Sequence, residues 1–379
     1  MQNIFLAYKK SGAKKYSVKL KIAYIHGRFG PHIMHGRLAK SVGAEFFMVD
    51  QHKKWNDGQH SKFFLIYAWI YNALAFKESS KYDIFLVSGS HFSPFIMKFL
   101  RLKKRQKIVA HLGDETMYFL YSGYYGKFMT FVLKMLLNQY DALLCEGQMA
   151  ADLAKLNGIT KPRIYTTYLG VPKERQYKLL KINPQLDQNN LITISSGPKG
   201  WREYYKGLDL MVACYSKAFE INNSLTFTIV GNWDIEVQNR LKSNLSDACV
   251  KSINFVGQTS EIDKYLSNST IYFHTSRGDA FPTVVLEAMA AGLIPIVSEW
   301  TGSKEVIETI DKSLIVPLEK ELIISKLIEI CAFNIEKRRE LSSKMKSVSQ
   351  NYTEEFAINH YQSTFIKISK DLNILLPFQ

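Results

Sequence analysis

Short apolar runs alternate with stretches of helical periodicity along the first half of the chain. The apolar runs are rich in residues that favour β-strands, and they occupy residues 19–26, 44–49, 83–88, 107–111, 141–146 and 163–167. The first run leads into a glycine loop. Strands that alternate with helices predict a parallel, doubly wound sheet. We therefore expect an α/β domain over residues 1–170.

A polar segment with two prolines and several Asn and Gln side chains separates this pattern from a second one. We interpret residues 171–190 as an interdomain linker. The alternation then restarts, with expected strands at residues 191–195, 225–230, 252–256, 271–274 and 294–297 and expected helices at residues 207–220 and 237–246. This pattern predicts a second α/β domain over residues 191–352, followed by C-terminal amphipathic helices over residues 353–379.

The segment from residue 274 to residue 306 carries the most specific chemistry in the chain. Its sequence, HTSRGDAFPTVVLEAMAAGLIPIVSEWTGSKEV, predicts a strand end, a glycine loop, a helix that begins at Pro282 and ends at Gly292, and a second buried strand. Proline suits the first helical position, because the amide that it lacks would have no partner there. The amides of residues 283–285 point out of the helix together with its positive dipole, which favours a bound phosphate.

Two carboxylates bracket the beginning of this helix. Glu287 lies four residues after Thr283, so it occupies the same helix face, about 6 Å further along the axis. Asp279 lies in the loop just before the helix. A ligand whose phosphate lies at the helix end can therefore contact one carboxylate on its sugar side and the other on its ribose side.

These residues resemble the C-terminal signature of the retaining glycosyltransferases of family 4, also called group 1, which have the GT-B fold. The signature has two acidic residues separated by seven others, an Ala-Met-Ala run, a proline and a Gly-x-x-Glu turn. The same order is found here as Asp279, seven residues, Glu287, Ala288-Met289-Ala290-Ala291-Gly292, Pro295 and Gly302-Ser303-Lys304-Glu305. One departure is Asp279, where the family usually has Glu. The resemblance implies two Rossmann-like domains that face a cleft, and a last helix that crosses back to the first domain.

The resemblance also implies cations at the diphosphate. Negative charge grows on a departing diphosphate, and preorganised cations stabilise it. Lys206, followed by Gly207, matches the family lysine that binds the diphosphate, and its partner cation is Arg202 or Lys199. These cations replace a metal ion in the expected site, because the Asp-x-Asp metal motif of the other major glycosyltransferase fold is absent from the sequence.

Other site residues follow from the same resemblance. His111 ends an expected strand where the family has a histidine near the donor sugar. Glu287 is expected to bind the ribose hydroxyls and Asp279 the donor sugar. The remaining donor-binding candidates lie in glycine loops, at strand ends and at the helix start: Gly27, Gly30, Gly231, Gly257, Gly278, Phe281, Pro282, Thr283 and Val284.

Histidines also surround the first glycine loop, at positions 26, 32 and 35. No Asp or Glu is grouped with them in the sequence, so we predict no metal site there. We expect no cofactor besides the substrate.

The implied reaction transfers a sugar from a UDP- or GDP-sugar to an acceptor hydroxyl, with retention of configuration at the anomeric carbon. The first domain is expected to bind the acceptor and the second domain the nucleotide sugar. The acceptor is expected to be a glycan or glycolipid of lipid-linked or cell-surface polysaccharide synthesis. Two other functions stay open: a GT-B sugar-nucleotide 2-epimerase, and a non-catalytic GT-B subunit that binds a partner.

Charge adds a membrane surface to the expected partners. The formal net charge is +15. Residues 93–107 place six cations beside apolar side chains, and residues 118–140 combine aromatic and Met side chains with two lysines and no acid. Such segments either dock on an anionic membrane surface or pack as ordinary helices on the sheet. No recognised nucleic-acid-binding motif is present, so we expect no nucleic-acid partner.

The cysteines and the apolar runs indicate where in the cell the protein is located. The four cysteines lack metal-ligand spacing, which favours reduced thiols in a cytoplasmic protein. The longest apolar run, at residues 63–76, has 14 residues, whereas a helix that crosses a bilayer needs about 20. The first residues lack the apolar core and cleavage site of a signal peptide. We therefore expect a cytoplasmic protein that is peripheral on the inner face of the cell membrane if its basic segments dock there.

Overall fold

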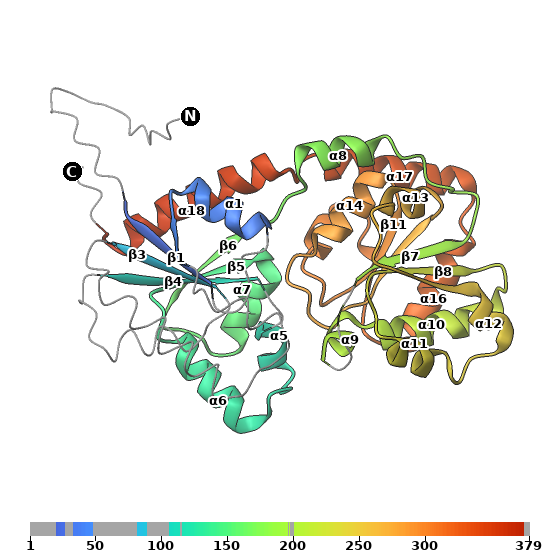
Figure 1. Ribbon diagram of the computed structural model, residues 1–379, viewed down its shortest axis with the longest axis horizontal. Helices are drawn as coiled ribbons and strands as arrows, with labels where there is room; N and C mark the ends of the chain where they lie inside the picture. The colour runs from blue at the N-terminus through green and yellow to red at the C-terminus, as the bar shows by residue number, and fades with distance from the viewer. Residues whose placement is uncertain are drawn as a thin grey trace.

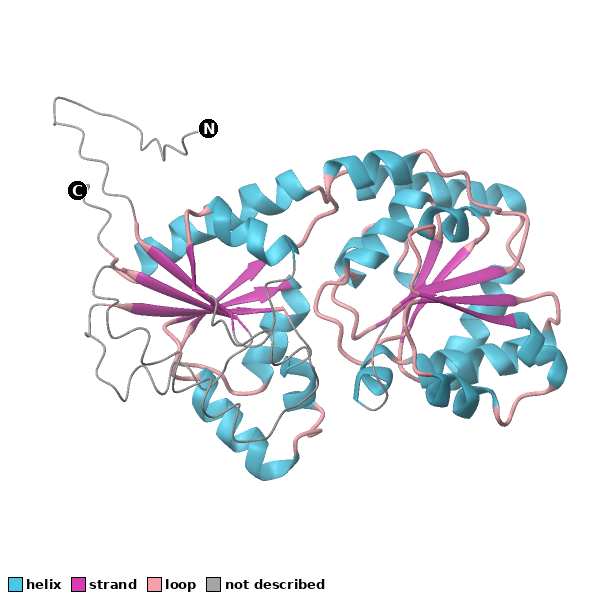
Figure 2. Cartoon of the chain, in the orientation of Figure 1, coloured by secondary structure: helices cyan, strands magenta, loops and turns pink. Residues whose placement is uncertain are grey.

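The computed structural model describes residues 20–26, 33–47, 82–88, 106–113, 116–195, 197 and 201–374. Two parallel sheets of six strands form two domains, and helices cover both faces of each sheet (Figures 1 and 2). The expected α/β class with two Rossmann-like domains is confirmed.

The first sheet has the strand order β2-β1-β3-β4-β5-β6. All residues of β3 and β5 are buried, as expected for parallel strands covered on both faces. The strands are β1 (Ile22–His26), β2 (Glu45–Phe47), β3 (Ile84–Ser88), β4 (Lys107–Leu112), β5 (Ala142–Glu146) and β6 (Arg163–Thr167). The described helices of this domain are α1 (Ile33–Ser41), α5 (Thr116–Tyr121), α6 (Gly126–Leu137) and α7 (Gly147–Leu156).

The second sheet has the strand order β12-β11-β10-β7-β8-β9. Its strands are β7 (Asn190–Ile194), β8 (Thr226–Val230), β9 (Ile253–Gly257), β10 (Ile271–His274), β11 (Ile294–Ser298) and β12 (Ile315–Val316). Its helices are α9 (Trp201–Lys206), α10 (Leu208–Ile221), α11 (Ile235–Lys242), α12 (Asp247–Ser252), α13 (Ile262–Ser267), α14 (Thr283–Ala291), α15 (Lys304–Glu308), the 3-10 helix η2 (Lys312–Leu314), α16 (Lys320–Cys331) and α17 (Ile335–Ser349).

The strand order of the second sheet positions a binding site. The order reverses between β7 and β10, which pair in parallel although two strands separate them in sequence. In open α/β sheets, ligands bind outside the carboxyl ends of the strands at such a reversal. The segments that follow β7 and β10 carry Lys206 and Asp279, so the topology brings these two residues to the same edge.

Two helices link the domains. The last helix, α18 (Glu354–Asp371), packs against α1 and β6 of the first domain (Figure 1), which confirms the crossing-back helix. The expected linker contains a helix that sequence analysis did not predict, α8 (Lys173–Leu180), which packs against α14. Only Gln176 and Leu179 of α8 are buried, so its apolar periodicity was too weak to indicate a helix.

Candidate active site

Lys206 and Asp279 meet at the edge where β7 and β10 end. Lys206 Nζ lies 2.5 Å from Asp279 Oδ2. The Tyr205 hydroxyl donates to Oδ1 at 3.2 Å. His274 donates from Nε2 to Oδ2 at 3.1 Å, because an ionised carboxylate can only accept. Sequence analysis missed Tyr205 and His274, although both adjoin predicted features, namely the Lys206-Gly207 pair and the end of a strand.

Burial and charge set the ionisation of this group. Asp279 is only 7% exposed. Burial raises the pKa of Asp279, but the Lys206 ammonium and the hydrogen bond from His274 outweigh burial and hold that pKa well below its usual range. Burial lowers the pKa of His274 more than Asp279 raises it, so the imidazole is neutral. The site therefore holds one buried carboxylate that neutralises one lysine.

Gly207 explains how Lys206 reaches Asp279. Its φ is +70°, and a Cβ atom at this position would lie 2.1 Å from the Thr275 carbonyl oxygen. Only glycine allows this junction between α9 and α10 to approach the loop after β10 so closely.

The start of α14 differs slightly from the sequence expectation. Pro282 is the N-cap residue, with ψ of 114°, and Thr283 is the first helical residue. The prediction that Pro282 begins the helix is therefore wrong by one position, because its backbone is still extended. The Val285 amide donates to the Pro282 carbonyl oxygen at 3.2 Å, so it is not free for a ligand as predicted. The amides of Thr283 and Val284 are the ones that point out of the helix end.

Glu287 has a partner that the sequence did not reveal. Its Oε2 accepts a hydrogen bond from Arg175 Nε at 2.9 Å. Arg175 belongs to α8 and also forms an ion pair with Asp263 of α13. The Arg175 Nη2 atom is buried and has no hydrogen-bond partner within the described part of the chain. No sequence signal pointed to Arg175, because it lies in the segment interpreted as a linker.

The other candidate cations and the β8–β9 glycines are placed as follows. Arg202 lies one helical turn before Lys206, and its aliphatic carbons cover Gly197. Gly231 and Gly257 are neighbours at the ends of β8 and β9, where the Gly231 amide donates to the Gly257 carbonyl oxygen at 2.9 Å. Three further candidates lie outside the described residues: Gly27, Gly30 and Lys199.

The loop with Gly278 and Phe281 contacts the first domain. A Cβ atom at Gly278 would lie 2.6 Å from Tyr118 of α5. Phe281 is 2% exposed and packs edge-on against Tyr168. A Cβ atom at Gly147, the first residue of α7, would lie 3.2 Å from the Ala280 carbonyl oxygen. The acidic loop of the second domain therefore faces the carboxyl edge of the first sheet.

His111 is buried at that edge, with 1% of its surface exposed. Its Nε2 atom lies 3.1 Å from Glu146 Oε1, and His35 Nε2 lies 2.6 Å from the same oxygen. The expectation that no carboxylate groups with the histidines near the first glycine loop is therefore wrong for His35. The fold brings Glu146 from the end of β5, and ligand atoms of these three residues lie within 4.8 Å of one another.

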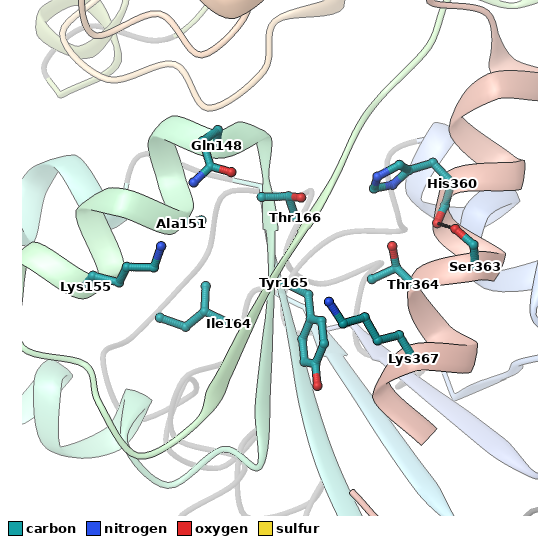
Figure 3. A pocket seen from close by; sticks show the side chains of 10 residues that line it. All are labelled: Gln148, Ala151, Lys155, Ile164, Tyr165, Thr166, His360, Ser363, Thr364 and Lys367. Atoms are coloured by element: carbon teal, nitrogen blue, oxygen red, sulfur yellow. Dashed lines mark hydrogen bonds between the residues drawn. The ribbon is translucent and has the colours of Figure 1, made fainter. Parts of the chain in front are cut away.

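A cavity of about 470 Å³ lies apart from these residues, between α7, β6 and α18 (Figure 3). Figure 3 shows Lys155 and Lys367 extending from opposite walls. The cavity is lined by Gln148, Ala151, Lys155, Ile164, Tyr165, Thr166, His360, Ser363, Thr364 and Lys367. None of the predicted site residues contributes to this lining.

A family model matches the second domain. Residues 186–348 match the model of the family described as Glycosyl transferases group 1. The matched residues cover most of the second domain. They include the candidate site residues Lys206, Asp279 and Glu287.

Curated relatives cover part of the chain. The amylovoran biosynthesis glycosyltransferase AmsK of Erwinia amylovora is 34% identical over 246 residues, which cover 60% of this chain and 55% of that protein. The N,N'-diacetylbacillosaminyl-diphospho-undecaprenol alpha-1,3-N-acetylgalactosaminyltransferase of Campylobacter jejuni is 23% identical over 158 residues. These residues cover 42% of this chain and 41% of that protein. The chain thus spans about half the length of the curated relatives that it matches.

A solved structure supports the fold of the whole chain. The structure of Anabaena Alr3699/HepE, in complex with UDP and glucose, matches 93% of this chain and 100% of that one, with a TM-score of 0.67 and 15% identity. The fold is GT-B, as the sequence resemblance implies. Among the helices of the described residues, none is long and apolar enough to cross a bilayer.

Proposed function

We propose that the chain is a retaining glycosyltransferase that moves a sugar from a UDP- or GDP-sugar to an acceptor hydroxyl. The Lys206–Asp279 pair at the β7–β10 edge carries this proposal. The Lys206 ammonium group would stabilise a diphosphate at the start of α14, together with the Thr283 and Val284 amides.

The donor would divide its contacts between the two carboxylates. Glu287 would accept hydrogen bonds from the ribose hydroxyls, with Arg175 holding its side chain in place. Asp279 would bind the donor sugar, whose diphosphate would then share Lys206. Arg202, or Lys199, would add the second cation, so the proposed reaction needs no metal. Without a side-chain nucleophile in the predicted set, the acceptor hydroxyl would attack from the face that the diphosphate leaves.

Similar proteins support the proposed substrate classes. HepE was solved with UDP and glucose, which supports a nucleotide-sugar donor. AmsK is named for amylovoran biosynthesis, and the Campylobacter enzyme is named for a diphospho-undecaprenol substrate. By analogy with these two relatives, we propose that the acceptor of this chain is a glycan or a lipid-linked molecule in polysaccharide synthesis.

Binding of nucleotide sugars tests the donor site. Thermal shift with UDP-, GDP-, ADP- and TDP-sugars, in EDTA, should show stabilisation by one nucleotide series. Glu287→Ala should abolish the shift, whereas Asp263→Asn should retain it, because Asp263 also pairs with Arg175 but is not assigned to the ribose. No shift from any nucleotide would contradict the assigned donor site and favour a non-catalytic subunit.

The products distinguish the two enzymatic functions. A transferase should release nucleoside diphosphate in amounts that match the sugar gained by the acceptor. An epimerised nucleotide sugar formed without acceptor would instead identify a 2-epimerase.

We also propose that α6 docks the enzyme on an anionic membrane. This helix has two lysines and no acid. This helix, the preceding turn and the end of α5 expose six large apolar side chains: Tyr121, Tyr124, Phe128, Met129, Phe131 and Met135. Phe128 is 76% exposed and Phe131 is 67% exposed. Such side chains suit insertion into a lipid interface, where the two lysines would attract anionic headgroups. The other basic segment, residues 93–107, lies outside the described residues except for its last two.

Vesicle sedimentation tests this surface. Phosphatidylglycerol vesicles should bind the protein, whereas phosphatidylcholine vesicles should bind it much less. The double variant Phe128→Ser, Phe131→Ser should lose at least about tenfold in affinity. The control Ile221→Ser, Ile235→Ser removes two equally exposed side chains of the second domain and should leave binding unchanged. Equal loss in both variants would contradict docking through α6.

A further inference from the structure

A buried carboxylate joins two histidines at the carboxyl edge of the first sheet. Glu146 is 2% exposed, and its Oε1 atom lies 2.6 Å from His35 Nε2 and 3.1 Å from His111 Nε2. A Cβ atom at Gly113 would lie 2.3 Å from the same oxygen, so glycine there leaves room for the carboxylate. The geometry brings together α1, β4 and β5, three elements that are far apart in sequence.

This group lies next to the donor loop of the second domain. Glu146 immediately precedes Gly147, where an added Cβ atom would lie 3.2 Å from both the Ala280 carbonyl oxygen and the Glu305 carboxylate. Ala280 directly follows Asp279 in the chain. Glu146 therefore lies beside the proposed donor sugar site.

The charges determine which nitrogen of His111 carries the proton. Burial raises the pKa of Glu146, but the charge of His35 and the closeness of His111 hold that pKa well below its usual range. Burial lowers the pKa of His111, so its imidazole is neutral. A neutral imidazole whose Nε2 lies 3.1 Å from a carboxylate oxygen favours the proton on Nε2, because a bare nitrogen there would face negative charge, and Nδ1 is then an acceptor. Within the described part of the chain, neither ring nitrogen of His111 makes a hydrogen bond of regular geometry, and Nε2 is the one that lies beside the carboxylate.

We propose that Glu146 and His35 are positioning residues that fix the Nε2–H tautomer of His111. Nδ1 then accepts a hydrogen bond from a hydroxyl of the donor sugar, once the groups that cover it in this state move apart. The inference rests on the proposed glycosyltransferase function. The opposite tautomer would present an N–H to the sugar and turn a bare Nε2 toward the buried carboxylate, which is unfavourable.

Metal binding is the competing role for the same three side chains. Two histidines and a carboxylate form a common ligand set for divalent transition metals. However, metal-bound histidines almost always donate their second nitrogen to a nearby acceptor, and His111 Nδ1 has no such partner within the described residues. The separations of 2.6 and 3.1 Å place both Nε2 atoms within hydrogen-bonding distance of Glu146 Oε1, although neither that oxygen nor His111 Nε2 makes a hydrogen bond of regular geometry within the described residues.

Histidine NMR tests the tautomer without any need for activity. In protein labelled with ¹⁵N-histidine, the His111 signals, assigned by their loss in His111→Gln, should show protonated Nε2 and bare Nδ1. Glu146→Gln should convert them to a mixture of tautomers. A wild-type imidazolium, a protonated Nδ1, or signals unchanged in Glu146→Gln would overturn the proposal. One equivalent of zinc or manganese in the purified protein, measured by mass spectrometry, would overturn it as well.

Kinetics then test the consequence for catalysis. Glu146→Gln should lower kcat at least about 100-fold, as expected when a histidine loses the group that orients it, with the donor KM within about threefold. Glu146→Asp should restore part of the loss, and Asp152→Asn, an exposed acid on α7, should have no effect. Folding is checked by thermal denaturation, and His35→Gln replaces Glu146→Gln if that variant does not fold. A folded Glu146→Gln with wild-type kcat would overturn the role.

The two proposals can fail separately. If the wild-type chain transfers no sugar from any nucleotide sugar, the proposed function is wrong, and the NMR result alone decides whether Glu146 fixes His111.

Discussion

At the scale of single residues, the two domains carry the same arrangement at the sheet edges where they face each other. Asp279 and Glu146 are both buried, and each is kept ionised by basic partners rather than by water. Each also faces a neutral, buried histidine, His274 or His111. Removing one partner from such a group leaves an uncompensated buried charge, which costs more than the intact pair contributes.

Lys206→Met should therefore destabilise the protein strongly. At pH 7 the free energy of unfolding should fall by about 3 kcal/mol, since Asp279 stays buried without its ammonium partner. The difference from wild type should narrow as the pH falls toward 4, because without Lys206 burial raises the pKa of Asp279, and the variant's carboxyl then takes up a proton that removes the buried charge. Urea unfolding at pH 7 and pH 5 measures both effects. Lys217→Met breaks the exposed pair with Glu220 and should cost less than about 0.5 kcal/mol.

The wild-type contribution of Asp279 has a defined pH window. Its pKa in the folded state is depressed, so its stabilising effect is complete above the unfolded value of about 3.8. The effect is lost as the pH falls below that value. If Lys206→Met lowers the free energy of unfolding by the same amount at both pH values, this account is wrong and the loss reflects packing alone.

Glu305 should show the opposite pH dependence. Burial raises its pKa to about 7, despite a hydrogen bond from the Gln148 backbone amide. The folded state thus prefers the protonated carboxyl, so the stability it contributes is complete below about pH 4.5 and is lost as the pH rises through 7. Glu305→Gln should match wild type in Tm at pH 5 and exceed it by about 2 °C at pH 8, after allowance for solvent screening.

The matched control for this prediction is Glu308→Gln, on the exposed side of the same helix. It should leave Tm unchanged at both pH values. If Glu305→Gln lowers Tm equally at pH 5 and pH 8, the carboxylate is ionised in the folded protein and the raised pKa is wrong.

The candidate site residues that could be named from the sequence are those whose signal is local. Asp279, Thr283 and Glu287 lie within nine consecutive residues, and Lys206 is marked by the glycine that follows it. Arg175 contacts Glu287 across 112 residues, and Glu146 meets His35 only because β5 and α1 end at the same edge. Such contacts depend on strand order, which a single sequence does not specify residue by residue.

At the scale of elements, long periodic patterns were predicted well and short ones were not. The expected helix at residues 207–220 is α10 (Leu208–Ile221), and the expected strands of both sheets are present within a few residues of their predicted ends. The two-residue strand β12 and the polar helix α8 carry too few apolar positions to stand out. Packing against a neighbouring element, rather than intrinsic periodicity, stabilises both.

A comparison of Gly207 and Gly257 distinguishes the cost of backbone strain from the cost of a steric clash. Gly207 and Gly257 have similar φ values, +70° and +78°, but a Cβ atom meets the Thr275 carbonyl oxygen only at Gly207. Gly257→Ala should cost about 1 kcal/mol of unfolding free energy, the penalty of the left-handed region. Gly207→Ala should cost about 3 kcal/mol, since the β10 loop must also move. Equal costs in urea unfolding would show that the α9–α10 junction is not tightly placed.

At the scale of the whole molecule, aromatic side chains of α5 hold the domains together. Tyr118 and Tyr121 contact Trp300, which follows β11, at ring-centroid distances of 5.1 and 5.4 Å. Phe119 lies edge-on to Tyr205, next to Lys206. Because α5 follows β4, whose second-last residue is His111, this contact couples the proposed donor-binding edge of the second domain to the buried histidines of the first. Closure of such domains excludes water from a bound nucleotide sugar and limits its hydrolysis.

Trp300→Ala should therefore shift the molecule toward an open state. Two aromatic pairs are lost, each worth about 0.5–1.5 kcal/mol beyond its buried area. A loss of about 2 kcal/mol reduces the ratio of closed to open molecules about 30-fold. Small-angle X-ray scattering should show a larger radius of gyration, and hydrolysis of the donor by water should rise relative to transfer. Tyr177→Ala, an exposed aromatic on α8, should change neither. An unaltered scattering curve for Trp300→Ala would mean that α18 and the packing of Phe281 against Tyr168, rather than α5, determine how the domains sit.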